Sequence, residues 1–584
     1  MLWLLPSPVG ALPYGRRLAG ARIKGADGVS IRLKQWSMPV MGCLALLYPA
    51  SVAAQPRATF DYVEYQGLDE TPPTPEGYYR NPVLPGFQPD PSIVRVGDDF
   101  YAVNSTFVWF PGLPIYHSRD LVHWKQIGNA IDRPDQMDFS GLATDRGLFA
   151  PAISYHDGRF WIVNTCIECG DNFVITAEHP EGPWSDPSWL DFGGIDPSLY
   201  FEGDRAWIVY NDAPSGEPRY EGHRALWLQE FDKATMQVKP ERTLLVDGGV
   251  DPSTRPIWAE GPHIYKIDGW YYLLTAEGGT ADQHSQTIYR SRSVDGPYVP
   301  GPVNPILTQR DLSPDRPDRV EATGHADMVQ LDDGSWGGLF LGTRPFAGQS
   351  TLLGRETFLL PLKWVDGWPR FLDPGEAVPP LVAKPDLPQS PGEDFSSWRD
   401  DFDQVSLSDE WITMRSPTGE SQMLHDVERG KLELVPVTKA AGSLDRFAFM
   451  GRRMRHHAAD FTTSVDLASE GQGDFAGLLA FMDEDHFLTV GIEDAGGGNR
   501  IVVRLCKDPV DAGRGTVIYS TPWNGDKAQL RLSMRGGSAT ASWRGGDEDS
   551  WQQSPQIDVE PLASIHAGLF TGLVVGPYAI AGEQ

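Results

Sequence analysis

A hairpin pattern that occurs five times limits what this chain can fold into. In the first copy, Asp90 precedes a short apolar strand, a Gly97-Asp98 turn and an aromatic strand that ends at Val103. Apolar runs around a tight Gly/Asp turn are typical of a β-hairpin. The second residues of the five aromatic strands are Tyr101, Trp161, Trp207, Tyr272 and Gly337. A repeat of this length built from strands and turns predicts one blade per copy, and therefore a five-bladed β-propeller.

The leading ends of these hairpins carry the candidate chemistry. Asp90 and Asp196 each lie 11 residues before the reference position of their copy. Glu260 and His325 each lie 12 residues before it. We therefore expect the four side chains to occupy one structural position in four blades and to meet at one mouth of the central channel. The alternative is that Asp-Pro and Glu-Gly-Pro only mark turns, as we expect for the isolated Asp251-Pro252-Ser253.

The bulk composition restricts the class of protein and of ligand. With 584 residues the chain exceeds a single hydrophobic core, and 62 Gly, 49 Pro and 19 Trp indicate a turn-rich, mostly β protein. The net charge of −30 disfavours nucleic acid and anionic membranes as partners. Aromatic side chains stack on flat sugar faces, so a carbohydrate is the favoured ligand. The sequence leaves the oligomeric state open.

The first 54 residues differ in character from the rest. Several Arg and Lys residues precede an apolar run from Met38 to Tyr48, which ends in Ser51-Val52-Ala53-Ala54. This order is typical of a secretory signal. The run is too short to span a bilayer. We therefore predict export to the periplasm or the medium.

The remaining chain divides by texture into four parts. Residues 55–77 are polar and Pro-rich and are predicted to be a lead-in to the propeller at 78–375. Residues 376–396 are rich in Pro and are expected to form a semi-rigid linker. Residues 397–584 show seven or more short alternating strands, which predict a β-sandwich. The fold class is therefore all-β.

Cys166 and Cys169 have the two-residue spacing of a zinc or redox pair. The sequence has no second pair to complete a zinc site and no helix-opening context for a redox motif. We therefore interpret the pair as structural or incidental.

Several motifs of the repeat region resemble glycoside hydrolase family 43. They are Pro89-Asp90-Pro91-Ser92, Gly194-Ile195-Asp196-Pro197, Ala259-Glu260-Gly261-Pro262, Thr323-Gly324-His325-Ala326 and Gly354-Arg355-Glu356-Thr357. The resemblance covers residues 78–375, and the C-terminal region resembles the concanavalin-like sandwich that follows the propeller in the β-xylosidase and α-L-arabinofuranosidase members. It implies an exo-acting, inverting hydrolase that releases β-D-xylose, α-L-arabinofuranose or both from xylan- or arabinan-derived oligosaccharides.

The resemblance also implies roles for individual residues. Asp90 would be the general base, Glu260 the general acid, and Asp196 the residue that orients Glu260 and raises its pKa. Phe107, Phe149, Thr280, His325 and Arg355 match positions near the sugar. No cofactor is required, although some members hold a Ca²⁺ ion near the position of His325. One departure is Phe149, where relatives often have Trp, so the sugar preference stays open.

Two other functions are compatible with the same residues. One is a non-catalytic carbohydrate-binding propeller, which would bind oligosaccharides without cleaving them. The other is a different furanosidase on a propeller, such as a retaining fructan hydrolase. Three acids at one channel mouth favour catalysis, because a binding protein does not need them. A glycosidase requires two carboxyl groups on opposite sides of the anomeric carbon.

Overall fold

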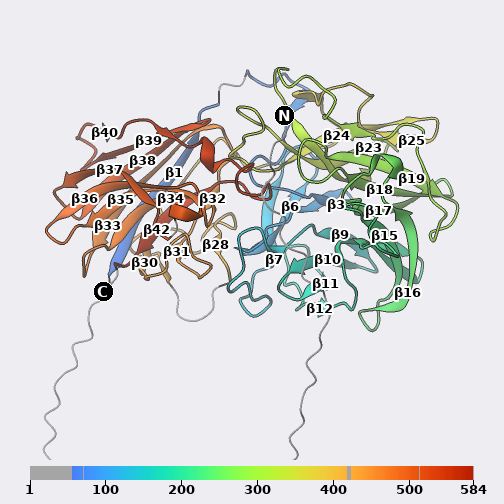
Figure 1. Ribbon diagram of the computed structural model, residues 1–584, viewed down its shortest axis with the longest axis horizontal. Coiled ribbons are helices and arrows are strands. Elements are labelled where there is room, and N and C mark those ends of the chain that lie inside the picture. The colour runs from blue at the N-terminus through green and yellow to red at the C-terminus, as the bar shows by residue number, and fades with distance from the viewer. Residues whose placement is uncertain (1–55, 70–71, 417–421, 512, 583–584) are drawn as a thin grey trace, which may run out of the picture. The chain divides into compact units, whose positions relative to one another are not determined.

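The computed structural model of the chain describes residues 56–69, 72–416, 422–511 and 513–582 (Figure 1). The predicted signal segment, 1–54, lies outside these residues. The regular structure of the described chain consists of β-strands apart from three short 3-10 turns, η1 (Pro252–Thr254), η2 (Pro509–Asp511) and η3 (Glu560–Leu562). No helix in these ranges is long and apolar enough to cross a membrane. The predicted all-β fold class is confirmed.

Five antiparallel sheets form the blades of the propeller. The first has β3 (Ser92–Val96), β4 (Asp99–Val103), β6 (Gly112–Ser118) and β7 (Lys125–Ile131); the second has β9 (Ala152–His156), β10 (Arg159–Ile167), β11 (Asp171–Ala177) and β12 (Ser188–Trp189), with β8 (Gly147–Leu148) on β10. The third has β13 (Ile195–Glu202), β14 (Arg205–Asp212), β15 (Ala225–Asp232) and β16 (Gln237–Asp247). The fourth has β17 (Glu260–Ile267), β18 (Trp270–Glu277), β19 (Ser285–Ser291), β20 (Val299–Pro300) and β21 (Leu307–Thr308), and the fifth has β22 (Glu321–Gln330), β23 (Trp336–Thr343), β24 (Glu356–Val365) and β25 (Trp368–Arg370).

The first strand of each four-stranded ladder lies innermost. β3 contacts β9, β9 contacts β13, β13 contacts β17 and β17 contacts β22, while β22 returns to β3 and closes the ring. Each leading strand therefore begins near the axis, as the repeat predicted. Short two-residue turns such as Gly97-Asp98 join the leading strands to their partners, because Gly tolerates the positive φ that such turns need.

The segments that precede and follow the propeller in the sequence pair with each other and bond to its last blade. β2 (Tyr78–Arg80) pairs with β26 (Leu381–Ala383). Asn81 exchanges hydrogen bonds with the backbone of Leu359, donating from Nδ2 and accepting at Oδ1, both at 2.8 Å. The region predicted as a linker, 376–396, is therefore partly a strand, and it buries Val378 and Val382. Its prolines do not hold it away from the propeller; its apolar residues pack on it.

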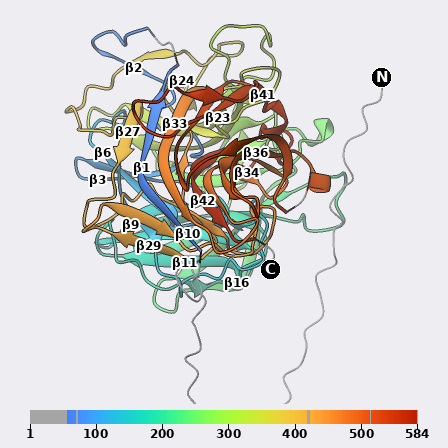
Figure 2. The same ribbon diagram turned by 90° about the vertical axis from the view of Figure 1, so that its left-hand side faces the viewer.

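The C-terminal region is a two-sheet sandwich, as predicted (Figure 2). One sheet contains β1 (Arg57–Gly67), β27 (Ser397–Asp400), β29 (Met423–Asp426), β30 (Lys431–Leu434), β33 (Ala458–Ala468), β38 (Lys527–Arg535), β39 (Ser538–Arg544), β40 (Gln552–Gln553) and β41 (Ile557–Asp558). The other contains β31 (Ala448–Phe449), β32 (Arg452–Arg453), β34 (Phe475–Asp483), β35 (His486–Asp494), β36 (Asn499–Cys506), β37 (Thr516–Trp523) and β42 (Val574–Ile580). A separate ladder joins β28 (Thr413–Met414) to β5 (Trp109–Phe110) in the propeller region.

Strand β1 corrects the prediction of a simple lead-in at 55–77. It runs beside β33 and also pairs with β30 and β27 (Figures 1 and 2). Phe60, Val63 and Tyr65 on this strand are buried in the sandwich core. Their spacing is interrupted at Phe60/Tyr62 by a bulge, which obscures the period of two in the sequence. The sandwich is therefore built from both ends of the described chain.

Candidate active site

A cavity of about 250 Å³ opens where the leading strands of the blades begin. It is lined by Asp90, Phe107, Phe149, Ala150, Ile195, Asp196, Ile257, Trp258, Glu260, Gly279, Thr280, His325, Arg355 and Phe570. All eight residues predicted for the site lie in this one cavity, although the sequence separates the first and last of them by 265 positions. The structure therefore assembles a single site from all five blades.

The strand registers show how the leading residues are placed. Asp90 and Asp196 each lie two residues before the first regularly paired residue, since Ser92 pairs with Val103 and Ser198 with Val209. In the fourth blade His263 pairs with Leu274. Gly261, not Glu260, therefore stands at the position of the two aspartates.

Backbone angles support the same correction. The φ values of Asp90, Asp196, Gly261 and His325 are 52°, 53°, 54° and 48°. The predicted equivalence of Glu260 with the aspartates was thus wrong by one residue. Glu260 matches Ile195 of the third blade, one step earlier on the strand. The residue count could not reveal this shift, because it measured from the far end of hairpins whose turns and pairing differ.

Asp90 sits among hydrogen-bond donors. Arg355 Nη1 donates to Asp90 Oδ1 at 2.8 Å, and the hydroxyl of Ser105 donates to Oδ2 at 2.5 Å. Burial alone would raise the pKa of Asp90, but the charge of Arg355, together with these hydrogen bonds, holds that pKa below its ordinary value. Asp90 is 5% exposed and is therefore a buried carboxylate that stays ionised.

Asp196 and Glu260 have the opposite environment. Burial is the largest influence on both carboxyl groups, and like charge acts in the same direction: that of Asp90 on Asp196, and those of Asp196 and Asp90 on Glu260. The pKa of Asp196 rises to about 7, and the pKa of Glu260 is raised well above its ordinary value. The backbone N–H of Gly261 donates to Asp196 Oδ2 at 3.3 Å. The surroundings of Glu260 therefore favour its protonated form, whereas those of Asp90 favour the ionised form.

His325 completes the rim between the two carboxyl groups. Its Nδ1 lies 3.9 Å from Asp90 Oδ1, and burial lowers its pKa to about 4, so the ring is neutral. A Cβ atom on Gly261 would come within 2.9 Å of His325 Nε2. This close approach explains why the fourth blade has glycine where the first and third have aspartate.

The surroundings of His325 do not form a cage of metal ligands. Among the described residues no three His, Cys, Asp or Glu side chains gather as a metal site. Ca²⁺ takes six to eight oxygen ligands. His325 offers nitrogen, and the Asp90 oxygens are taken by Arg355 and Ser105. The side chains present therefore do not fit a Ca²⁺ ion held by protein oxygens, and no catalytic step is assigned to one.

Three phenylalanines form an aromatic wall beside Asp90. The ring centroids of Phe107, Phe149 and Phe570 lie 5.4–5.9 Å apart, and the Arg355 guanidinium lies 5.4 Å from the Phe570 ring. Phe107 also pairs with Leu148 by backbone hydrogen bonds, so the first blade braces the second. Phe570 comes from the sandwich, and nothing in the sequence around it identifies it as a site residue.

A backbone clamp brings the Phe570 loop to the site. Ser564 N donates to Thr351 O, and Leu573 N donates to Leu352 O. Gly354 meets Gly572 so closely that a Cβ atom at Gly354 would lie 2.8 Å from Thr571 O. Two glycines therefore let the sandwich loop touch the chain immediately before Arg355. Five further residues line the cavity and were not predicted from the sequence: Ala150, Ile195, Ile257, Trp258 and Gly279.

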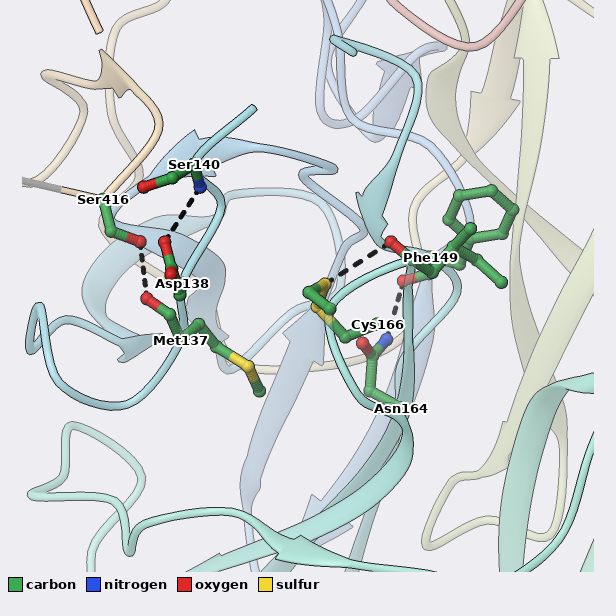
Figure 3. Close-up of a disulfide and its surroundings, with 9 residues drawn as sticks. Met137, Asp138, Ser140, Phe149, Asn164, Cys166 and Ser416 are labelled. Carbon is green, nitrogen blue, oxygen red and sulfur yellow. Dashed lines mark hydrogen bonds between the residues drawn. A yellow bond between two sulfur atoms is a disulfide. The ribbon is translucent and has the colours of Figure 1, made fainter. Parts of the chain in front are cut away.

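Cys166 and Cys169 form a disulfide at the end of β10 (Figure 3). Asn164, two residues before Cys166, donates from Nδ2 to the backbone oxygen of Phe149 at 2.7 Å. The strand that carries the disulfide thus holds the chain under the aromatic wall. This observation agrees with a structural role for the cysteine pair.

Comparisons with known proteins agree with this architecture. Residues 79–369 match the model of glycosyl hydrolases family 43, and residues 399–584 match the beta xylosidase C-terminal concanavalin A-like domain. A non-reducing end alpha-L-arabinofuranosidase from Bacteroides ovatus is 36% identical over 87% of this chain and 92% of its own length. A xylosidase/arabinosidase from Butyrivibrio fibrisolvens is 34% identical over 86% and 95%.

Solved structures give the same result. A family 43 protein from a capybara gut metagenome superposes with a TM-score of 0.83 at 32% identity, covering 90% of this chain and 100% of that one. The chain belongs to glycoside hydrolase family 43. The family resemblance and the propeller-plus-sandwich architecture predicted from the sequence are thereby confirmed, and the chain is a glycoside hydrolase.

Proposed function

We propose that the protein is an exo-acting, inverting glycosidase that releases β-D-xylose, α-L-arabinofuranose or both from oligosaccharides derived from xylan or arabinan. The observation that carries the proposal is that the pKa values of Asp90 and Glu260 are shifted in opposite directions within one cavity. An inverting glycosidase needs one ionised carboxylate to activate water and one protonated carboxyl to release the leaving group. The lowered pKa of Asp90 suits the first role and the raised pKa of Glu260 suits the second.

In this mechanism Asp90 is the general base. Its carboxylate accepts a proton from the attacking water while Arg355 and Ser105 hold the two oxygens in place. Glu260 remains partly exposed towards the cavity, as a proton donor to substrate must. It donates its proton to the glycosidic oxygen as the bond to the leaving sugar breaks.

Asp196 would tune Glu260 in two ways. Its negative charge, when present, raises the pKa of Glu260, and its hydrogen bond from Gly261 N fixes the chain next to the acid. His325, Thr280 and the aromatic wall would bind the sugar ring that carries the anomeric carbon. These roles need no metal, because the two carboxyl groups account for both proton transfers.

The size of the cavity favours removal of one sugar at a time. At about 250 Å³ it is smaller than typical ligand pockets of about 300–1,000 Å³. Relatives that span almost the whole chain are named for arabinofuranosidase and xylosidase activity. The two pentoses present similar hydroxyl groups, so one small pocket is compatible with either.

Two measurements test the proposal. Release of p-nitrophenol from the β-D-xyloside and the α-L-arabinofuranoside identifies the sugar, and failure with both would refute the substrate class. NMR of the first product anomer then tests the stereochemistry. We expect inversion; retention would favour a propeller furanosidase that uses a covalent intermediate. Binding of oligosaccharides without hydrolysis would instead support the non-catalytic alternative.

We also propose that the protein is exported, on the basis of its first 54 residues. Recovery of the mature chain from the periplasm or medium, with its N-terminus sequenced, tests this. An unprocessed chain in the cytoplasm would contradict it.

A further inference from the structure

The lining of the cavity includes two chemically different groups of residues. One is Asp90, Arg355 and the aromatic wall that includes Phe570. The other is the apolar pair Ile257 and Trp258, which closely precedes Glu260 in the chain. The proposed mechanism uses the first group to bind the sugar whose bond is cleaved. It assigns nothing to Ile257 and Trp258.

Ile257 and Trp258 are held firmly at the rim. Trp258 N donates to Gly222 O at 2.8 Å, and Gly278 N donates to Ile257 O at 2.8 Å. A Cβ atom on Gly222 would lie 2.8 Å from Ile257, and one on Gly279 would lie 3.1 Å from it. Two glycines thus allow the close seating of this pair. Despite this packing, Ile257 is 39% exposed, and it lines the cavity.

Trp258 has a backbone conformation that a bulky residue rarely adopts. Its φ is 53°, in the left-handed region, where non-glycine residues are strained. Such strain persists only where surrounding contacts impose it, and it is common at ligand sites. Here the strained residue lies two positions before the proposed general acid. The chain is therefore turned so that the indole lines the cavity next to Glu260.

Arg224 supports the indole from behind. Its guanidinium lies 4.2 Å from the centre of the Trp258 ring, although Arg224 itself does not line the cavity. Its Nε is buried and has no hydrogen-bond partner within the part of the chain that the structure describes. Two carboxyl groups act on Arg224 through their charge: Asp212, which is itself paired with Arg242 at 2.8 Å, and Glu260. The guanidinium therefore stacks on Trp258 while its Nε makes no hydrogen bond, and its charge also reaches Glu260.

We infer that Ile257 and Trp258 form the binding platform for the leaving sugar, and that Arg224 is the positioning residue that holds the indole. A general acid donates its proton to the oxygen that joins the two sugars, so the second ring must lie on the Glu260 side of the cavity. An indole beside an exposed isoleucine presents a flat apolar surface. The ligand is a neutral sugar ring in an oligosaccharide, bound through its C–H face. This inference rests on the proposed function.

The test compares two substrates that share the released pentose but differ in leaving group. One is the unbranched disaccharide; the other is the glycosyl fluoride, which has no second ring. In Trp258→Ala we expect kcat/KM for the disaccharide to fall about tenfold, the effect of losing one stacked ring. Hydrolysis of the fluoride stays within about twofold, because no platform contact is lost. Equal losses on both substrates would overturn the inference.

Trp270→Ala is the matched control. Trp270 is also stacked by an arginine, since the Arg292 guanidinium lies 3.5 Å from its ring centre. It lies at the turn of the β17–β18 hairpin, at the opposite end from Glu260, and outside the cavity. It should leave the ratio of the two activities unchanged. Arg224→Ala should raise KM for the disaccharide without changing kcat for the fluoride, and Arg224→Lys, which lacks the planar stack, should not restore KM. A normal KM in Arg224→Ala would refute the positioning role.

Binding measurements separate this inference from the proposed function. Calorimetry on Glu260→Gln with the monosaccharide and the disaccharide gives the affinity added by the second ring. That gain should disappear in the Glu260→Gln, Trp258→Ala double variant. If wild-type protein cleaves neither substrate, the proposed function fails, whereas the calorimetric difference still decides the platform. A double variant that retains the full gain overturns the platform alone.

Discussion

Asp90 and Asp196 show how one local motif gives two chemistries. Both belong to Asp-Pro-Ser, both have φ near 52°, and both occupy the same register position in their blades. The pKa of Asp90 is nevertheless lowered, and the pKa of Asp196 is raised to about 7. The positive charge of Arg355 acts on Asp90, whereas the negative charge of Asp90 acts on Asp196. The backbone repeat therefore fixes where an acid stands, and the neighbouring blade fixes whether it is charged.

The largest expected effect separates the base from the acid. Asp90→Asn should lower kcat by about 10³-fold for every leaving group, because water activation is always needed. Glu260→Gln should cause a similar loss only with poor leaving groups such as sugars, since activated leaving groups need little protonation. Rates on a series of aryl glycosides of different leaving-group pKa check this. A flat dependence in Glu260→Gln would contradict the acid role.

Removing the raised carboxyl should stabilise the protein. Asp196 has an ordinary pKa of 3.8 and a folded value of about 7, so the folded state keeps a proton that the unfolded chain releases between these values. Stability conferred by this group is complete below about pH 4 and is lost as the pH rises to about 7. Asp196→Asn should therefore raise the free energy of unfolding by about 2–4 kcal/mol at pH 8 and leave it unchanged at pH 3.5. Urea titrations at both pH values measure the difference.

The same variant should change the activity profile. Without the Asp196 charge the pKa of Glu260 falls, so the alkaline limb of kcat/KM should move to lower pH. An unchanged alkaline limb would show that the like charge does not reach Glu260.

Replacing Arg355 should raise the pKa of Asp90, so that it resembles Asp196. In Arg355→Met the pKa of Asp90 rises, because burial is no longer opposed by the guanidinium. The acid limb of kcat/KM should move up by about 1–2 pH units. Arg355→Lys should recover part of this shift. An acid limb that stays in place would assign it to another group.

Gly261 occupies the position of Asp90 and Asp196 in the fourth blade, and its replacement should have a smaller effect, on stability. Gly261→Ala forces a Cβ atom into a left-handed residue and against His325. Gly269→Ala, at the turn of the same hairpin, has a φ of 74° and meets only the end of Arg292, at 3.5 Å. Both lose about 1 kcal/mol to backbone strain, and Gly261→Ala should lose about 1 kcal/mol more. Equal destabilisation by urea would show that His325 moves aside.

The sequence predicted the propeller well because the hairpins repeat a local pattern of strand, turn and strand. It placed eight residues in one cavity because residues at equivalent ends of the blades must meet. It placed Glu260 at the position of the aspartates, although Gly261 is the equivalent residue. A shift of one residue in strand pairing leaves no mark in composition. It missed Phe570 and β1 for a different reason: both act through contacts with segments hundreds of residues away, which no local pattern encodes.

Strand β1 has a consequence for how the protein is made. It is synthesised first among the described strands, yet its partners β30 and β33 follow the whole propeller. Its apolar face must therefore wait for β30 and β33, and Phe570 follows both of these strands in the chain. The ribosome can finish all five blades before the pocket has its final wall. A chain cut after residue 396 would be a propeller with an unpaired strand and an open site, not a smaller enzyme.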